Sequence, residues 1–158
     1  MHAAEPSKEY EVKAAYLYNF ANFASWPVSA FDGDTAPFRI CTAGQNPFGS
    51  ALDDTVRGER VGQHPLSVVR VTSPAEVKGC HILFVPASIS NAASYVAAVG
   101  GAPVLTIGEG DRFLSEGGAL RFVLDNGRVR FDANAKAAAA AGINLTSRLL
   151  QVARQVQQ

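Results

Sequence analysis

Two cysteines are the residues of this chain with the clearest potential for covalent chemistry. Cys41 and Cys80 are the only cysteines in the sequence. A bond between them would close a loop of about 40 residues, and loop entropy would make it worth about 4 kcal/mol of stability. Two separate buried thiols explain the pair equally well, because cysteine is often a small core residue. The spacing alone leaves both interpretations open.

Two carboxylates could bind a cation or another small ligand. Glu109 and Asp111 follow an apolar segment, 104–107, in a glycine-rich stretch, and open α/β sheets bind ligands beyond the carboxyl ends of their strands. A solvated loop is the simpler interpretation, and we favour it. None of the three histidines pairs with cysteine or acidic residues at metal-ligand spacing; they are His2, His64 and His81. We therefore expect no metal and no cofactor, and we expect His81, at the head of an apolar strand, to pack in the core or at its edge.

The catalytic motifs that an α/β fold often carries are missing from this sequence. There is no G-x-S-x-G elbow and no G-x-x-x-x-G-K-[ST] loop, and the nearest approach to G-x-G-x-x-G, Gly108-Glu109-Gly110, lacks the third glycine. The predicted strand ends Thr42-Ala43-Gly44 and Val85-Pro86-Ala87 lack the carboxylates of a phosphoacceptor site. We therefore expect that the protein is not an enzyme.

Aromatic residues are concentrated near the N-terminus. Seven lie within about twenty residues of one another, more than one buried helical stripe requires: Tyr10, Tyr16, Tyr18, Phe20, Phe23, Trp26 and Phe31. Packing of all seven on a sheet is the favoured interpretation. Because Tyr and Trp are enriched at protein interfaces, the surplus makes Tyr18 and Trp26 candidates for a partner-binding surface.

The elements that would position these residues alternate between strand and helix. A first helix is capped by Ser7, carries an apolar face of Val12, Tyr16, Phe20 and Phe23, and is ended by Trp26-Pro27. Strands are predicted at 38–42, 66–71, 81–85 and 104–107, and further helices at about 50–56, 91–99, 135–141 and from 146 onward, the last with Leu149, Leu150, Ala153 and Val156 toward the core. This alternation predicts a parallel sheet.

A hairpin is predicted after the alternating region. Segments 120–124 and 128–131 flank Asp125-Asn126-Gly127, and Asn-Gly between alternating runs is a strong hairpin pattern. We expect the hairpin arginines to face solvent. The predicted fold is α/β, a mostly parallel sheet with helices on both faces and an antiparallel hairpin at one edge.

Composition restricts the partners of the chain. It has 158 residues, 47% hydrophobic and 18% charged, with fourteen acidic and fourteen basic residues. A neutral chain without a basic run lacks the charge that nucleic acid or an anionic membrane surface requires. No apolar run reaches the length of a membrane-spanning helix, and no apolar leader precedes the first helix. We expect residues 1–8 to be an N-terminal remnant or tag and residues 9–158 to form one domain.

Read in order, several segments resemble the YfiR family of periplasmic regulators. They extend from about Glu9 to Ala153, and it is the ordered set that is specific. The matching stretches are Lys13 to Phe20 running on to Phe23 and Trp26-Pro27, Phe38 to Cys41, Asn46 to Gly49, Gly79 to Phe84, Pro103 to Gly108, Phe122 to Leu124 through Phe131, and Ile143 to Leu150.

The resemblance implies a periplasmic protein, often dimeric, that binds the periplasmic part of an inner-membrane diguanylate cyclase and holds it inactive, which lowers cyclic-di-GMP signalling. It implies that an OmpA-type lipoprotein relieves the inhibition. It also implies that Cys41 and Cys80 are an oxidisable pair, and that Phe122 and Ile143 belong to a hydrophobic patch that binds the partner; core packing explains these two positions equally well. The alternative is a periplasmic module that senses an aromatic metabolite or a nucleotide beside Phe122 or the 108–111 loop.

Overall fold

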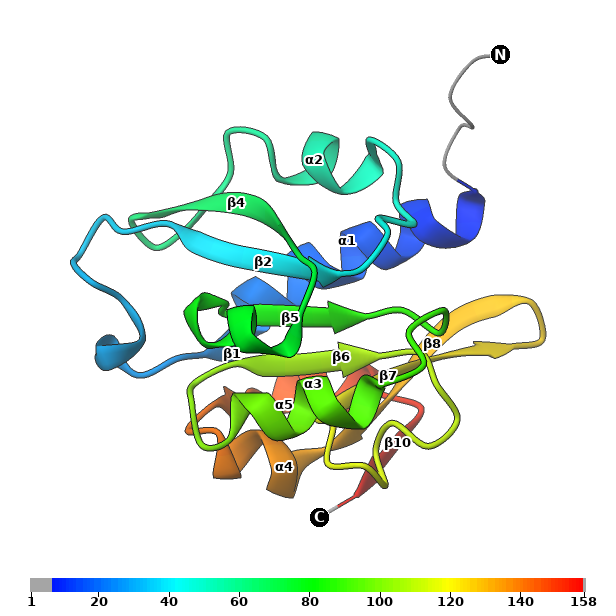
Figure 1. Cartoon of the computed structure of the whole chain (residues 1–158). Coiled ribbons are helices and arrows are strands. Elements are labelled where there is room, and N and C mark those ends of the chain that lie inside the picture. The colour runs from blue at the N-terminus through cyan, green and yellow to red at the C-terminus, as the bar shows by residue number, and fades with distance from the viewer. Residues whose placement is uncertain (1–6, 158) are drawn as a thin grey trace.

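The computed structural model describes residues 7–157 and contains five α-helices, two short 3-10 helices and ten strands in that range (Figure 1). The helices are α1 (Lys8–Phe23), η1 (Val28–Ala30), α2 (Ala51–Val56), η2 (Pro74–Gly79), α3 (Ala92–Val99), α4 (Ala135–Ala140) and α5 (Ser147–Val152). The strands are β1 (Ala24–Ser25), β2 (Phe38–Ala43), β3 (Arg60–Val61), β4 (His64–Val71), β5 (Ile82–Val85), β6 (Leu105–Gly108), β7 (Leu120–Asp125), β8 (Arg128–Asn134), β9 (Asn144–Leu145) and β10 (Gln155–Gln157).

Eight of the strands form one mostly parallel sheet. Their order is β10-β8-β7-β6-β5-β2-β4-β3, and every neighbouring pair is parallel except β7 with β8 and β3 with β4. The predicted α/β fold is confirmed. A separate two-stranded ribbon joins β1 to β9, with Ala24 opposite Leu145.

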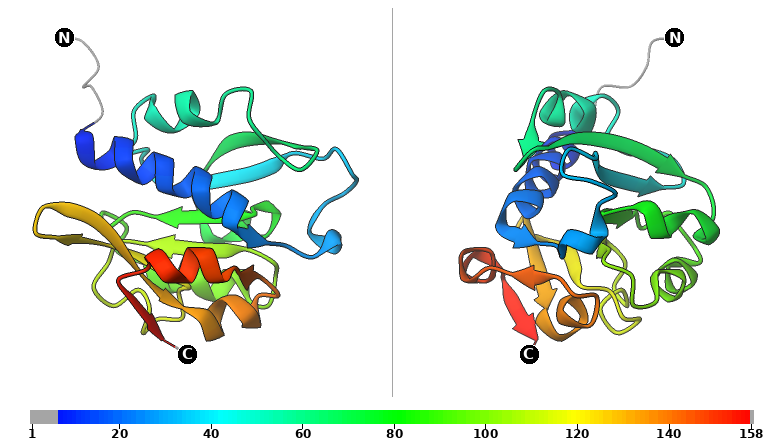
Figure 2. Two further views of the ribbon diagram at one scale, coloured as in Figure 1. Left: turned by 180° about the vertical axis from the view of Figure 1, so that it is seen from behind. Right: turned by 90° about the vertical axis from the view of Figure 1, so that its left-hand side faces the viewer.

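Helices cover both faces of the sheet and divide the core into two layers. One layer packs α1, α2, α4 and α5 against the sheet, and the other packs α3 and η2. The right-hand view of Figure 2 shows α1 and α5 on one side of the sheet and α3 on the other. Strand β5 is buried along its whole length, as expected for a strand covered on both faces.

Helix α1 begins where the sequence predicts and presents a different face to the core. The Ser7 hydroxyl accepts a hydrogen bond from the Tyr10 amide, which satisfies a free donor of the first turn. The helix ends at Phe23, three residues before Trp26, because Ala24 is already extended and pairs with β9. Its fully buried apolar residues include Ala14 and Leu17, so the predicted face is only partly correct.

The C-terminal segment differs from its prediction. The predicted helix from residue 146 onward is shorter than expected, because α5 ends at Val152 and residues 155–157 form β10 parallel to β8. Val156 still packs against the core, as predicted, but from a strand. Arg154 forms a bidentate ion pair with Asp132 of β8, which directs the chain onto the sheet. The hairpin β7–β8 therefore carries one further strand on its outer side.

The turn of this hairpin follows from its residue types. Asn126 and Gly127 both have positive φ, 52° and 79°, the conformation that a two-residue hairpin turn requires. Of the predicted remnant at residues 1–8, residues 1–6 lie outside the described part of the chain, and α1 already begins at Lys8. Within residues 7–157, none of the helices combines the length and apolar character needed to cross a bilayer.

Candidate functional site

Open α/β sheets usually bind ligands beyond the carboxyl ends of their central strands. Strand β2 has β4 on one side and β5 on the other, so the strand order reverses there. In this chain an aromatic side chain fills the crevice. Phe48 is fully buried, and its ring lies 5.0 Å from that of Phe84 and 5.5 Å from that of Tyr10. The turn that carries Phe48 therefore closes this position with apolar packing.

Glu109 lies at the same end of the sheet and is buried within a set of intramolecular contacts. Its side chain is 6% exposed and forms a 2.5 Å ion pair with Lys13 of α1. It also accepts hydrogen bonds from the Tyr10 hydroxyl and the Ala87 amide, each at 2.8 Å. The interpretation of Glu109 as a solvated loop residue is wrong, because the fold brings α1 over this loop.

Lys13 is the residue that makes this arrangement possible. Its side chain is 5% exposed, and its ammonium contacts Glu9 as well as Glu109. Tyr10 shares the site, and its pKa is raised because the side chain is buried and because Glu109 accepts its hydrogen bond. The phenol therefore stays protonated and donates a hydrogen bond at any physiological pH, and the two α1 side chains tie the helix to the 109–111 loop.

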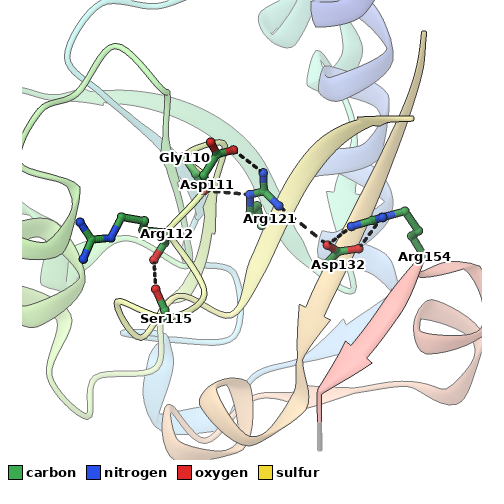
Figure 3. Close-up of polar contacts among 7 residues, drawn as sticks. All are labelled: Gly110, Asp111, Arg112, Ser115, Arg121, Asp132 and Arg154. Carbon is green, nitrogen blue, oxygen red and sulfur yellow. Dashed lines mark hydrogen bonds and ion pairs between the residues drawn. The ribbon is translucent and has the colours of Figure 1, made fainter. Parts of the chain in front are cut away.

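Asp111 differs from Glu109 in its exposure. Its side chain is 95% exposed and pairs at 2.8 Å with Arg121 of β7, which also donates to the Gly110 carbonyl. Figure 3 shows how the contacts continue from Arg121 to Asp132 of β8 and on to Arg154. Arg121 is only 20% exposed, so the prediction that the hairpin arginines face solvent is wrong at this position, where two carboxylates hold it.

A glycine next to these carboxylates has a packing role. A side chain at Gly108 would collide with the Phe113 ring, with an ideal Cβ only 2.4 Å from its atoms, and Gly118 meets the same ring. Phe113 is 1% exposed. Gly108 of the incomplete G-x-G pattern therefore allows an aromatic ring to approach the backbone. Phosphate binding is not needed to explain this pattern.

The remaining space at this end of the sheet is a cleft of about 380 Å³ lined by α1, the 109–111 loop and β7. Its charged groups are those just described, and they pair with one another. Among residues 7–157 no group of three or more His, Cys, Asp or Glu side chains is arranged to hold a metal ion.

The cysteines are joined. Cys41 and Cys80 form a disulfide with a Cα–Cα distance of 5.8 Å. Strand register alone would separate them, since Ile40 lies opposite Ile82 in the parallel pair. Cys80 is the residue that ends η2, before β5 begins, so it approaches the sheet from the face covered by η2, where Cys41 is also buried.

The opposite, amino-terminal end of the sheet carries an aromatic and histidine cluster. The Phe31 ring is stacked between two imidazoles, 3.7 Å from His64 and 4.3 Å from His81. Trp26 packs edge-on against Phe38 and donates its indole N–H to the His81 carbonyl at 3.0 Å. Trp26 is therefore half-buried and already has a partner within the chain, and residues 26–37 are held to the sheet.

His81 is buried, 3% exposed, and both ring nitrogens are engaged. Its Nδ1 accepts from the Arg39 amide at 2.9 Å, and its Nε2 lies 2.7 Å from the Ala30 carbonyl. An acceptor Nδ1 places the ring proton on Nε2, which gives the neutral imidazole. Burial lowers the pKa of His81 below its ordinary value of 6.5. The expectation that His81 packs in the core or at its edge is confirmed.

The other predicted contact residues do not form one surface. Tyr18 is half-buried and donates to Glu59 at 2.9 Å. Phe122 and Ile143 are each 2% exposed, so neither lies on the surface. Phe122 points to the face of β7 covered by α1 and packs against Tyr16 and Phe20, because alternate residues of a strand point to opposite faces.

An apolar groove of about 480 Å³ lies between α1 and α5, and the sequence interpretation did not identify it. The left-hand view of Figure 2 shows the two helices on the same face of the sheet. The groove is lined by Val12, Ala15, Tyr16, Asn19, Phe20, Phe23, Phe131, Arg148, Leu149 and Val152. Three residues of the predicted α1 stripe, Val12, Tyr16 and Phe23, are only partly buried here. The surplus of aromatic residues near the N-terminus could have predicted this groove if α5 had been expected to pack beside α1.

Comparison with known proteins assigns the chain to a family. The family model described as YfiR/HmsC-like matches residues 10–154, which is nearly the whole chain. The chain belongs to the YfiR/HmsC-like family. The family is one of periplasmic regulatory domains. The Cys41–Cys80 disulfide is consistent with a location outside the cytoplasm.

One solved structure shares the fold of this chain. A crystal structure of a conserved domain protein from Vibrio cholerae superposes with a TM-score of 0.58 at 10% sequence identity. The alignment covers 91% of this chain and 60% of that protein, so the chain spans less than two thirds of its length. The likeness shows a common fold. No curated protein matches the sequence.

Proposed function

We propose that this chain is a periplasmic regulatory domain that binds the periplasmic part of an inner-membrane diguanylate cyclase and holds the cyclase inactive. The observation that carries the proposal is the family match over residues 10–154. Inhibition by binding requires an accessible surface on a stable scaffold, and it requires no reaction centre.

Two features of the structure support a binding role. The position where an α/β sheet most often binds a small molecule is filled by Phe48 and by the contacts of Glu109 with Lys13 and Tyr10. Apolar side chains are instead accessible between α1 and α5, where Val152 is 56% exposed. Grooves of this kind accept protein segments.

Binding and inhibition can be tested together. The purified chain is titrated into the periplasmic domain of the diguanylate cyclase encoded beside it, and cyclic-di-GMP synthesis by the full-length cyclase in membranes is measured with and without the chain. We expect binding at micromolar concentration or tighter and a dose-dependent fall in synthesis. No binding, or binding that leaves synthesis unchanged, would contradict the proposal.

A further inference from the structure

We infer that the groove between α1 and α5 binds an amphipathic helix of the cyclase's periplasmic domain, with the apolar face of that helix in the groove and a carboxylate against Arg148. The inference rests on the proposed function and specifies the surface and the chemistry of the partner segment. Length, charge and accessibility of the groove each support this occupant.

The length of the groove fits a helix. One wall is formed by α1 from Val12 to Phe23, with Tyr16 and Phe20 between them. These residues are spaced i, i+4, i+8 and i+11, which is about three helical turns or about 16 Å. A helix lying alongside would present apolar residues at i, i+3 or i+4, and i+7 to such a wall. A small molecule would occupy only part of it.

The charge of the groove selects the partner. Arg148 is the one charged residue among those lining it, and its guanidinium lies 5.0 Å from the centre of the Phe23 ring. Among residues 7–157 no acidic side chain forms an ion pair with Arg148, whereas Arg121 and Arg154 are both paired with carboxylates. An occupant with a carboxylate at this end would complete a contact that the chain itself leaves open.

The rim of the groove allows close approach. Ala15 and Asn19 are exposed on α1 between the larger side chains, and short side chains let a second backbone come near. Val152 of α5 is one of three large hydrophobic residues that the described part of the chain exposes. The other two, Val28 and Leu124, lie outside the groove lining.

The exposed hydrophobic residues supply a matched experiment. Affinity for the periplasmic domain of the cyclase is measured by titration calorimetry with the full chain carrying Val152→Asp and, as control, Val28→Asp. A second pair reverses charge, Arg148→Glu in the groove and Arg128→Glu on the exposed start of β8. Melting temperatures of all four variants verify that each is folded.

The outcomes separate the two proposals. We expect Val152→Asp and Arg148→Glu each to weaken binding by at least about tenfold and both controls to bind within about twofold of the unmodified chain. If the unmodified chain binds and the groove variants bind as tightly as their controls, the groove assignment falls and the proposed function stands. If the unmodified chain does not bind, both fall. If Arg148→Glu abolishes binding of phenylacetate to the chain but leaves affinity for the cyclase domain unchanged, the groove binds a small aromatic carboxylate and the helix assignment is wrong.

Discussion

At the scale of single residues, the chain keeps two unusual groups in its interior, a neutral histidine and a buried lysine. His81 is held neutral because the Arg39 amide donates to its Nδ1 and burial opposes its charging. The Lys13 side chain is enclosed between Glu9 and Glu109. A single substitution can remove the contacts of either residue, so the contribution of each to stability can be measured.

The depressed pKa of His81 predicts a stability change with pH. The unfolded chain takes up a proton near pH 6.5, whereas the folded chain resists protonation to a lower pH. Between those two values the unfolded state binds more protons, so the free energy of unfolding falls as pH drops below about 6.5 and levels off below the folded-state pKa. Urea unfolding at intervals from about pH 7.5 to 5 measures it.

The control for this prediction is His81→Gln, which removes the titrating ring and keeps a side chain that can donate and accept. We expect a lower stability at every pH and a shallower slope below about pH 6.5 than in the unmodified chain. Identical slopes in the two proteins would show that other groups cause the pH dependence.

The buried ion pair predicts a non-additive pair of substitutions. Glu109→Gln removes the partner of a buried ammonium and should cost about 3 kcal/mol of unfolding free energy, because Lys13 keeps only Glu9. Lys13→Met leaves Glu109 uncompensated and should cost a similar amount. The double variant should cost clearly less than the sum. Additive losses, measured by urea unfolding, would mean that the two side chains act independently.

At the scale of elements, the first helix and the last strand of the described chain are attached by charged side chains. Helix α1 is tied to the 109–111 loop through Lys13, and β10 is tied to β8 through Arg154 and Asp132. Asp111, on the same loop, reaches Arg121 and so joins the second set of contacts (Figure 3). One loop after β6 therefore connects both terminal elements.

This attachment predicts a local effect of one substitution. Asp132→Asn removes the charge that binds Arg154 and should release β10, since three residues of edge strand provide few other contacts. We expect faster amide hydrogen exchange at residues 155–157 with protection of β5 unchanged. The control Asp125→Asn removes a longer contact, 3.9 Å from Arg130 at the hairpin end, and should leave β10 protected. Unchanged exchange in Asp132→Asn would show that backbone pairing alone holds β10.

At the scale of the whole molecule, the disulfide acts mainly on the unfolded chain. It links residues 39 apart in sequence and joins the segment between η2 and β5 to the central strand β2. Closing a loop of this length lowers the entropy of the unfolded state, so the Cys41→Ala/Cys80→Ala variant should lose about 3 to 4 kcal/mol of stability. Denaturant unfolding of the oxidised chain and the variant tests this. A loss below about 1 kcal/mol would mean that the closed loop contributes little.

Local patterns were sufficient for much of this fold. The alternation of strands and helices, the Asn126-Gly127 turn and the Ser7 cap each depend on residues close together in sequence, and all three are present in the structure. The family could also be recognised from the sequence, because segments that match it occur in order along nearly the whole chain. Composition and missing motifs led to the hypothesis of a binding protein, which stays a prediction.

Tertiary structure alone decided where the functional side chains point. Glu109 is buried because α1 crosses a loop almost a hundred residues away, and the segment after α5 pairs with β8, where Arg154 meets Asp132. Phe122 is buried while Val152 is exposed, although both are apolar. Hydrophobicity favours the burial of a side chain. The packing of distant elements determines which side chains are buried within the chain and which stay exposed, where a partner could contact them.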